Sequence, residues 1–120
     1  MEARARIRNV PIAPRKVRLV ADLVKDLDVT EALNQLTFTH KAASPVIHKL
    51  IKSAVANALY MEPDVSEDDL YVKQIVVDDG ITRKWIRPRA RGMANRILRR
   101  RSHITVVLDE ESEESEENGD

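Results

Sequence analysis

The chain has 120 residues and no cysteine, and a third of its residues are charged. This length predicts one domain with one core, and the lack of cysteine excludes disulfides, a thiol nucleophile and a cysteine-based zinc site. No apolar run approaches the roughly 20 residues that span a bilayer, and the N-terminus shows no secretory signal. We therefore expect no membrane segment and a reducing, cytoplasmic setting.

The formal net charge of zero hides a strong sorting of charge along the chain. Residues 109–120 hold 8 of the 20 acidic residues and no basic residue. The first 108 residues then carry 20 bases against 12 acids, which is a formal charge of +8. Residues 83–101 contain nine Arg or Lys and no acid. Such a block repels itself and attracts polyanions.

A strand and a helix are the first elements expected in chain order. Arginine alternates with small or apolar residues over 3–8, which is the period of a strand. Pro14 suits the first turn of a helix because its missing N–H would be unpaired there anyway. A stripe of Val17, Val20 and Val24, widened by Leu19 and Leu23, predicts a helix over about 14–25.

Two further helices are expected before the next strand. A short one is predicted over 30–36, with Asp28 or Thr30 as its cap. Apolar residues then recur at helical spacing from Val46 to Leu59, which predicts a long amphipathic helix. Thr39 is its expected N-cap, and Pro45 means that the helix either begins near Ser44 or is kinked in its first turn.

Two β-branched runs, 70–77 and 103–108, predict antiparallel strands that enclose the basic block. Pro88 and Gly92 predict a turn between them. We therefore expect one long β-hairpin whose base joins the sheet, with a basic extension over about 80–101. Twelve residues per side would project roughly 40 Å. A lone two-stranded ribbon is marginally stable in water, so this extension needs a partner to become ordered.

The predicted fold class is α+β: a small antiparallel sheet packed against about three helices, with a long protruding β-hairpin and a disordered acidic C-terminal tail. The domain is expected to cover residues 1–108. The tail, 109–120, has no apolar residue and is expected to be disordered. Its acids could compete with nucleic acid for the basic extension, or they could serve solubility alone.

Nine cations on a narrow projection predict a nucleic-acid phosphate backbone as the partner. Arginine outnumbers lysine eight to one there, and guanidinium groups bind phosphate in a bidentate manner. Trp85 could stack on a base or fill an apolar notch. The predicted contact residues of the extension are Arg83, Lys84, Trp85, Arg87, Arg89, Arg91, Arg96, Arg99, Arg100 and Arg101. A second basic cluster, which would face the same partner if the first strand pairs beside the hairpin, comprises Arg4, Arg6, Arg8, Arg15, Lys16 and Arg18.

Catalytic and metal-binding patterns are weak in this sequence. The three histidines lack a metal-ligand spacing, and no phosphate-binding loop or nucleophile motif is present. Asp78 and Asp79 are better explained as charged residues at a strand end that favour solubility than as an acid–base pair. We therefore expect neither enzyme activity nor a cofactor or metal.

Three separated segments resemble the family of ribosomal protein twenty-two of the bacterial large subunit. They are Lys84 with Arg89-Ala90-Arg91-Gly92 and then Ser102-His103-Ile104-Thr105-Val106-Val107, the run 16–23, and the run 53–58. The resemblance implies a structural component of the large ribosomal subunit that binds and stabilises its rRNA. It also implies that the hairpin tip, Arg89, Ala90, Arg91 and Gly92, reaches the wall of the nascent-peptide exit tunnel. The implied partners are large-subunit rRNA, neighbouring ribosomal proteins and, transiently, the nascent polypeptide, with no homo-oligomer.

Two other function classes remain open from the residues alone. A DNA-binding regulator could place a β-ribbon in a groove, but it would need a dimer to present two ribbons. An RNA-modifying enzyme would need a reactive constellation that the sequence does not display.

Overall fold

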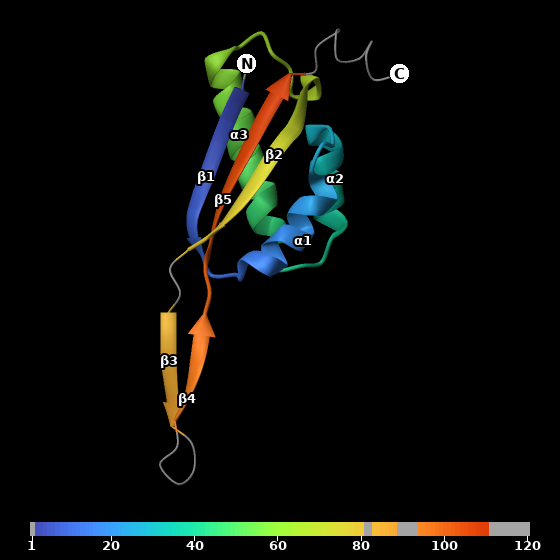
Figure 1. Cartoon of the computed structure of the whole chain (residues 1–120). Coiled ribbons are helices and arrows are strands. Elements are labelled where there is room, and N and C mark those ends of the chain that lie inside the picture. Colours follow the sequence, from blue (N-terminus) through green and yellow to red (C-terminus); the bar gives the residue numbers. More distant parts are fainter. Residues whose placement is uncertain (1, 81–82, 89–93, 111–120) are drawn as a thin grey trace.

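A computed structural model describes residues 2–80, 83–88 and 94–110, with only the backbone described for 83–88 and 94–99. The chain measures 68 × 28 × 23 Å. A body of one sheet and three helices lies at one end, and a two-stranded ribbon projects from it (Figure 1). The predicted α+β class is therefore confirmed.

Three antiparallel strands form the sheet of the body, in the order β1-β5-β2. They are β1 (Glu2–Val10), β2 (Leu70–Asp79) and β5 (Ser102–Glu110). The pairing of β2 with β5 confirms the predicted hairpin base. Since β1 pairs with the other side of β5, the basic first strand does lie beside the hairpin.

The helices α1 (Pro14–Val24), α2 (Val29–Phe38) and α3 (Ser44–Met61) lie on one side of this sheet (Figure 1). A short 3-10 turn, η1 (Glu67–Asp69), precedes β2. All three helices were predicted within a few residues of their observed ends. None of the helices in the described part of the chain is both long enough and apolar enough to span a membrane.

The core joins the helix stripes to alternate residues of the sheet. On α3, Ile47 and Ile51 are fully buried, and so are Ala54 and Ala58 farther along. The small side chains lie on the helix that packs against β1, whose buried residues include two further alanines, Ala3 and Ala5. Small residues on both surfaces let the helix lie close to the strand, and Asn57 Nδ2 fixes the contact by donating to the Arg4 carbonyl at 2.8 Å.

Two predictions about the helices are wrong. Thr39 does not cap α3, because α2 continues to Phe38 and the Thr39 hydroxyl donates to the Gln35 carbonyl at 2.7 Å. α3 begins at Ser44, and Pro45 fits its first turn. Leu19 and Leu23 do not widen the apolar stripe of α1, because they are 65% and 47% exposed. The buried residues of α1 are instead Pro14, Val17, Val20, Ala21 and Val24.

The ribbon consists of β3 (Arg83–Pro88) and β4 (Ala94–Arg99), which form a separate two-stranded sheet. The predicted tip at residues 89–92 lies outside the described residues. The predicted tail boundary is two residues too early, because β5 continues through Glu110, which pairs with Leu70. The remainder of the tail, 111–120, lies outside the described residues.

Candidate nucleic-acid interface

The basic arm, residues 80–101, leaves the body between the end of β2 and the start of β5. At its base the Gly80 N–H donates to the Arg101 carbonyl at 2.7 Å. A Cβ at Gly80 would lie 3.1 Å from both the carbonyl carbon and the carbonyl oxygen of Arg101. The two sides of the arm therefore begin in close backbone contact, and a side chain at Gly80 would press against the opposite backbone.

The end of β1 is tied to the same place. The pairing of β1 with β5 shifts between Ile7 and Val10, and Asn9 takes a φ of 56° there. The Arg101 guanidinium donates to the Asn9 carbonyl at 3.1 Å, and the Asn9 N–H donates to His103 Nδ1 at 3.1 Å. These two bonds hold the end of β1 beside the base of the arm.

The loop before α1 and the first half of α1 also reach the base of the arm. The hydroxyl of Ser102, which is fully buried, donates to the Ile12 carbonyl at 2.6 Å. On α1, Arg18 Nη2 donates to the Val77 carbonyl of β2 at 2.8 Å. Arg18 and Arg101 thus each donate to a backbone carbonyl of another segment. Both side chains therefore help to stabilise this junction.

Arg15 and Lys16 occupy the first turn of α1 and are exposed. Cations at this end of a helix are unfavourable because the helix dipole is positive there. The first turn contains no acidic residue, and within the described residues neither cation has an ion-pair partner. An anionic partner would relieve this local excess of positive charge.

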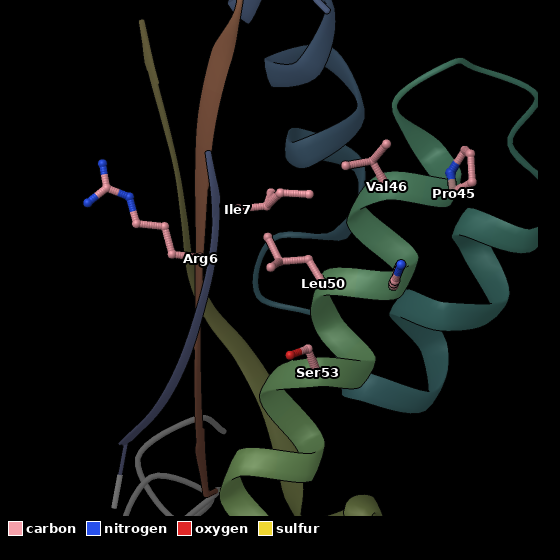
Figure 2. A pocket seen from close by; sticks show the side chains of 7 residues that line it. Arg6, Ile7, Pro45, Val46, Leu50 and Ser53 are labelled. Carbon is pink, nitrogen blue, oxygen red and sulfur yellow. The ribbon is translucent and has the colours of Figure 1, made fainter. Parts of the chain in front are cut away.

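β1 carries a row of exposed arginines, Arg4, Arg6 and Arg8, hereafter the arginine row. Figure 2 shows Arg6 on the side of β1 away from α3, whereas Ile7 points toward the helix. The row therefore lies on the outer face of the sheet, which is the face opposite the helices. Arg4 approaches Glu2 at 3.3 Å and remains 69% exposed.

The structure brings some residues of the two predicted basic clusters to the same end of the molecule. Arg8, Arg15, Arg18 and Arg101 belong to segments that meet at the base of the arm. In the arm, the backbone register sets Arg83 opposite Arg99 and Ile86 opposite Arg96. The side chains of Arg83, Lys84, Trp85, Arg87, Arg96 and Arg99 lie outside the described set, as do residues 89–92 entirely.

The other end of the outer face is held by ion pairs. Lys73 Nζ contacts Glu2 Oε1 and lies 3.6 Å from Asp109 Oδ2. The hydrogen bond from Lys73 lowers the pKa of Glu2, and the same bond raises the pKa of Lys73. A hydrogen bond shared with the Glu62 carboxyl raises the pKa of Glu110.

A mainly apolar groove lies between β1 and α3, beside the arginine row. It has a volume of about 480 Å³ (Figure 2). Its lining residues are Arg6, Ile7, Pro45, Val46, Lys49, Leu50 and Ser53. In the parts of the chain that the structure describes, no group of three or more His, Asp or Glu is placed to bind a metal ion.

Three residues of the junction escaped the sequence reasoning. Asn9, Gly80 and Ser102 connect β1, the arm and β5. Asn9 offered a weak signal, because asparagine is among the few residues that adopt positive φ readily. The close approach of Gly80 to Arg101 depends on the pairing of two distant strands, which no local pattern shows.

Comparisons with known proteins agree over almost the whole chain. A family model described as ribosomal protein L22p/L17e matches residues 5–109. The curated protein "Large ribosomal subunit protein uL22" of Leptospira biflexa serovar Patoc (strain Patoc 1 / Ames) is 53% identical over 110 residues, covering 92% of this chain and 95% of that protein. The proteins of the same name from Lactobacillus delbrueckii subsp. bulgaricus (strain ATCC BAA-365 / Lb-18) and Staphylococcus aureus (strain JH9) are 51% and 48% identical, covering 90% and 98% of this chain and 92% and 99% of those proteins.

Proposed function

Because the chain belongs to the ribosomal protein L22p/L17e family and is thus a structural constituent of the large ribosomal subunit, we propose that it is held there by large-subunit rRNA bound along the arm and the basic surface at its base. The family is not enzymatic, which sets aside the RNA-modifying enzyme, and its ribosomal role sets aside the DNA-binding regulator. As a bacterial ribosomal component the chain works in the cytoplasm.

The observation that carries the proposal is the concentration of basic residues, without acidic ones, in the arm and at its base. Nine basic residues without an acid lie between 83 and 101, and Arg15 and Lys16 are exposed at the start of α1 beside the base of the arm. A free protein gains nothing from such crowding, since the charges repel one another. Phosphate groups packed around the arm would remove the repulsion and give the ribbon the partner that it lacks.

The junction gives the arm a fixed direction in this proposal. The Gly80 N–H joins the two sides of the arm at its base. Ser102 then ties the base to the loop before α1, and Arg101 ties it to β1. The body of the protein would rest on the rRNA surface with Arg15 and Lys16, and the arm would enter between RNA helices. A two-stranded ribbon is thin enough for such a gap.

Salt dependence of rRNA binding tests the proposal directly. Six to eight phosphate contacts would lower the affinity about 1,000-fold or more when the salt concentration rises fourfold. We compare the full chain with two variants that each lose four positive charges through substitution by glutamine. In the arm variant the replaced residues are Arg83, Arg87, Arg96 and Arg99; in the control they are exposed residues of the helical side, Lys25, Lys41, Lys49 and Lys52.

The arm variant should reduce the slope of log affinity against log salt by about 3, since each contact contributes roughly 0.7–0.9. The control should leave the slope nearly unchanged. Equal reductions in both variants would mean that binding follows total charge and not the arm, and the proposal would fail.

We further propose that the tip of the arm, residues 89–92, lines the nascent-peptide exit tunnel. The test is a site-specific cross-link, which is simple to place because the chain has no cysteine. Ala90→Cys in assembled ribosomes should cross-link to a stalled nascent chain, and Ser53→Cys on α3 should not. Cross-linking at neither position would rule out the tip as part of the tunnel wall, while leaving rRNA binding unaffected.

A further inference from the structure

The outer face of the sheet is uncovered in the described part of the chain, because all three helices lie on the other side (Figure 1). The arginine row runs along β1 on this face. Arg4 lies opposite Val107 of β5, and Arg6 lies opposite Thr105. Within the described residues, Arg6 and Arg8 have no ion-pair partner. The face therefore presents a positive stripe beside neutral residues.

The acidic C-terminal run begins on this same face. Asp109, its first residue, pairs with Lys73, and it stands opposite Glu2 in the register of β1 and β5. The last residue of β5, Glu110, pairs with Leu70. The chain therefore leaves the sheet beside the start of β1, next to the first residue of the arginine row, and its first acid is already paired with a cation on this face.

Ten residues follow Glu110, and six of them are acidic: Glu111, Glu113, Glu114, Glu116, Glu117 and Asp120. Fully extended, these ten residues span roughly 33 Å. Arg8 lies six residues along β1 from Glu2, or roughly 20 Å. The tail is therefore long enough to cover the whole arginine row and carries two acids for each arginine.

We propose that residues 111–120 fold back over the outer face of the sheet and form ion pairs with Arg4, Arg6 and Arg8. The tail then covers, in the free protein, a basic surface that a polyanion would otherwise occupy. The docking itself depends only on this chain. Its consequence, competition with RNA, rests on the proposed function.

Distance and chemistry favour the arginine row over two other regions that the tail could bind, the basic arm and the groove between β1 and α3. The arm begins beyond Ser102, at the far end of β5 from Glu110, which is roughly 30 Å away for a nine-residue strand. The tail would be almost fully stretched before it reached the strands of the arm, and Arg101 is the one cation of the arm whose described contacts place it near Arg8, because it donates to the Asn9 carbonyl. The groove between β1 and α3 is mainly apolar, and the tail has no apolar side chain to place in it.

The association is expected to be weak and sensitive to salt. Exposed ion pairs contribute little each and are screened, but the short connection holds the tail at a millimolar effective concentration. Removal of the tail charges should therefore raise the affinity for RNA about two- to tenfold at low salt. This gain should vanish as the salt concentration rises.

A spin label on the tail tests the docking without RNA. The variant Asn118→Cys carries a nitroxide at the only thiol of the chain, and paramagnetic broadening is measured on backbone amides. We expect strong broadening at Arg6 and Arg8, little at Thr37 on α2, and loss of the difference at high salt. In a control variant the tail acids are changed to Gln and Asn. The broadening at Arg6 and Arg8 should then be no stronger than the broadening at Thr37. Equal broadening of all three amides at low salt would overturn the proposal.

Two further measurements separate this docking from the alternatives. In the first, spin-labelled protein at natural isotope abundance is mixed with isotope-labelled protein that carries no spin label. Broadening in that mixture would show that the tail binds a second copy, which would contradict the intramolecular proposal. RNA affinity is then measured for the full chain and the charge-neutral tail variant. Equal RNA affinities at low salt would refute the competition and leave the rRNA-binding proposal intact, whereas no RNA binding by either protein would refute the rRNA-binding proposal and leave the docking intact.

Discussion

Three basic residues on or directly after α1, replaced one at a time by glutamine, should give three different results, because the structure assigns each a different role. Arg15 is exposed in the first turn, Arg18 donates to the Val77 carbonyl at 2.8 Å, and Lys25 follows the last residue of the helix. The helix is 11 residues long, so Arg15 and Lys25 are separated by roughly 15 Å. All three substitutions remove one positive charge.

Arg15→Gln should weaken rRNA binding without affecting stability. Loss of one phosphate contact lowers the salt slope by about 0.7–0.9, which corresponds to about a fivefold loss of affinity near physiological salt. Because the Arg15 side chain is exposed and has no ion-pair partner among the described residues, the free energy of unfolding should change by less than about 0.5 kcal/mol.

Arg18→Gln should affect stability first. It removes a charged hydrogen bond to a backbone carbonyl, which is worth about 1 kcal/mol at a partly exposed site. For a chain of this size that loss lowers the melting temperature by about 4 °C. Lys25→Gln lies at the end of α1 away from the arm and should change neither stability nor rRNA affinity appreciably.

The assays are thermal unfolding followed by circular dichroism and rRNA binding over a series of salt concentrations. If Arg18→Gln melts like the parent protein, the bond to Val77 does not form in solution and the reasoning about the junction is wrong. If Lys25→Gln weakens binding as much as Arg15→Gln, the interface is set by total charge and not by position on α1.

Three further substitutions test the body of the fold. Ser102→Ala should cost about 1–2 kcal/mol in urea unfolding, because the Ile12 carbonyl loses its buried donor; unchanged stability would refute that bond. Ile51→Ala, at a fully buried position, should cost about 3–4 kcal/mol in the same assay, and a loss below about 1 kcal/mol would contradict the packing of α3. Glu62→Gln should leave the C-terminal end of β5 better protected from amide exchange at neutral pH. The raised pKa of Glu110 means that its shared hydrogen bond is complete below the usual carboxyl range of about pH 4.3 and is lost as pH rises through the folded-state pKa. Identical protection factors at acidic and neutral pH in the parent protein, after correction for the intrinsic exchange rates, would contradict this pairing.

The sequence determined the elements because each depends on a local period. The helix from Ser44 to Met61 follows from apolar residues at helical spacing, and the strand from Leu70 follows from β-branched residues. Charge sorting along the chain predicted the basic arm in the same way, since it depends only on the order of residues. The wrong cap, Thr39, shows the limit of this reasoning, because helix ends depend on where the neighbouring helix stops.

Only the tertiary structure decided how the basic residues divide between fold and interface. Arg15 and Arg18 are three residues apart and equivalent in sequence, yet Arg18 reaches a carbonyl of β2 and Arg15 reaches solvent. The same holds for Leu19, which fits an apolar stripe and is 65% exposed. Packing between segments far apart in the chain decides which side of a helix meets a sheet. The same packing decides which carbonyl an arginine can reach, and no local sequence pattern contains that information.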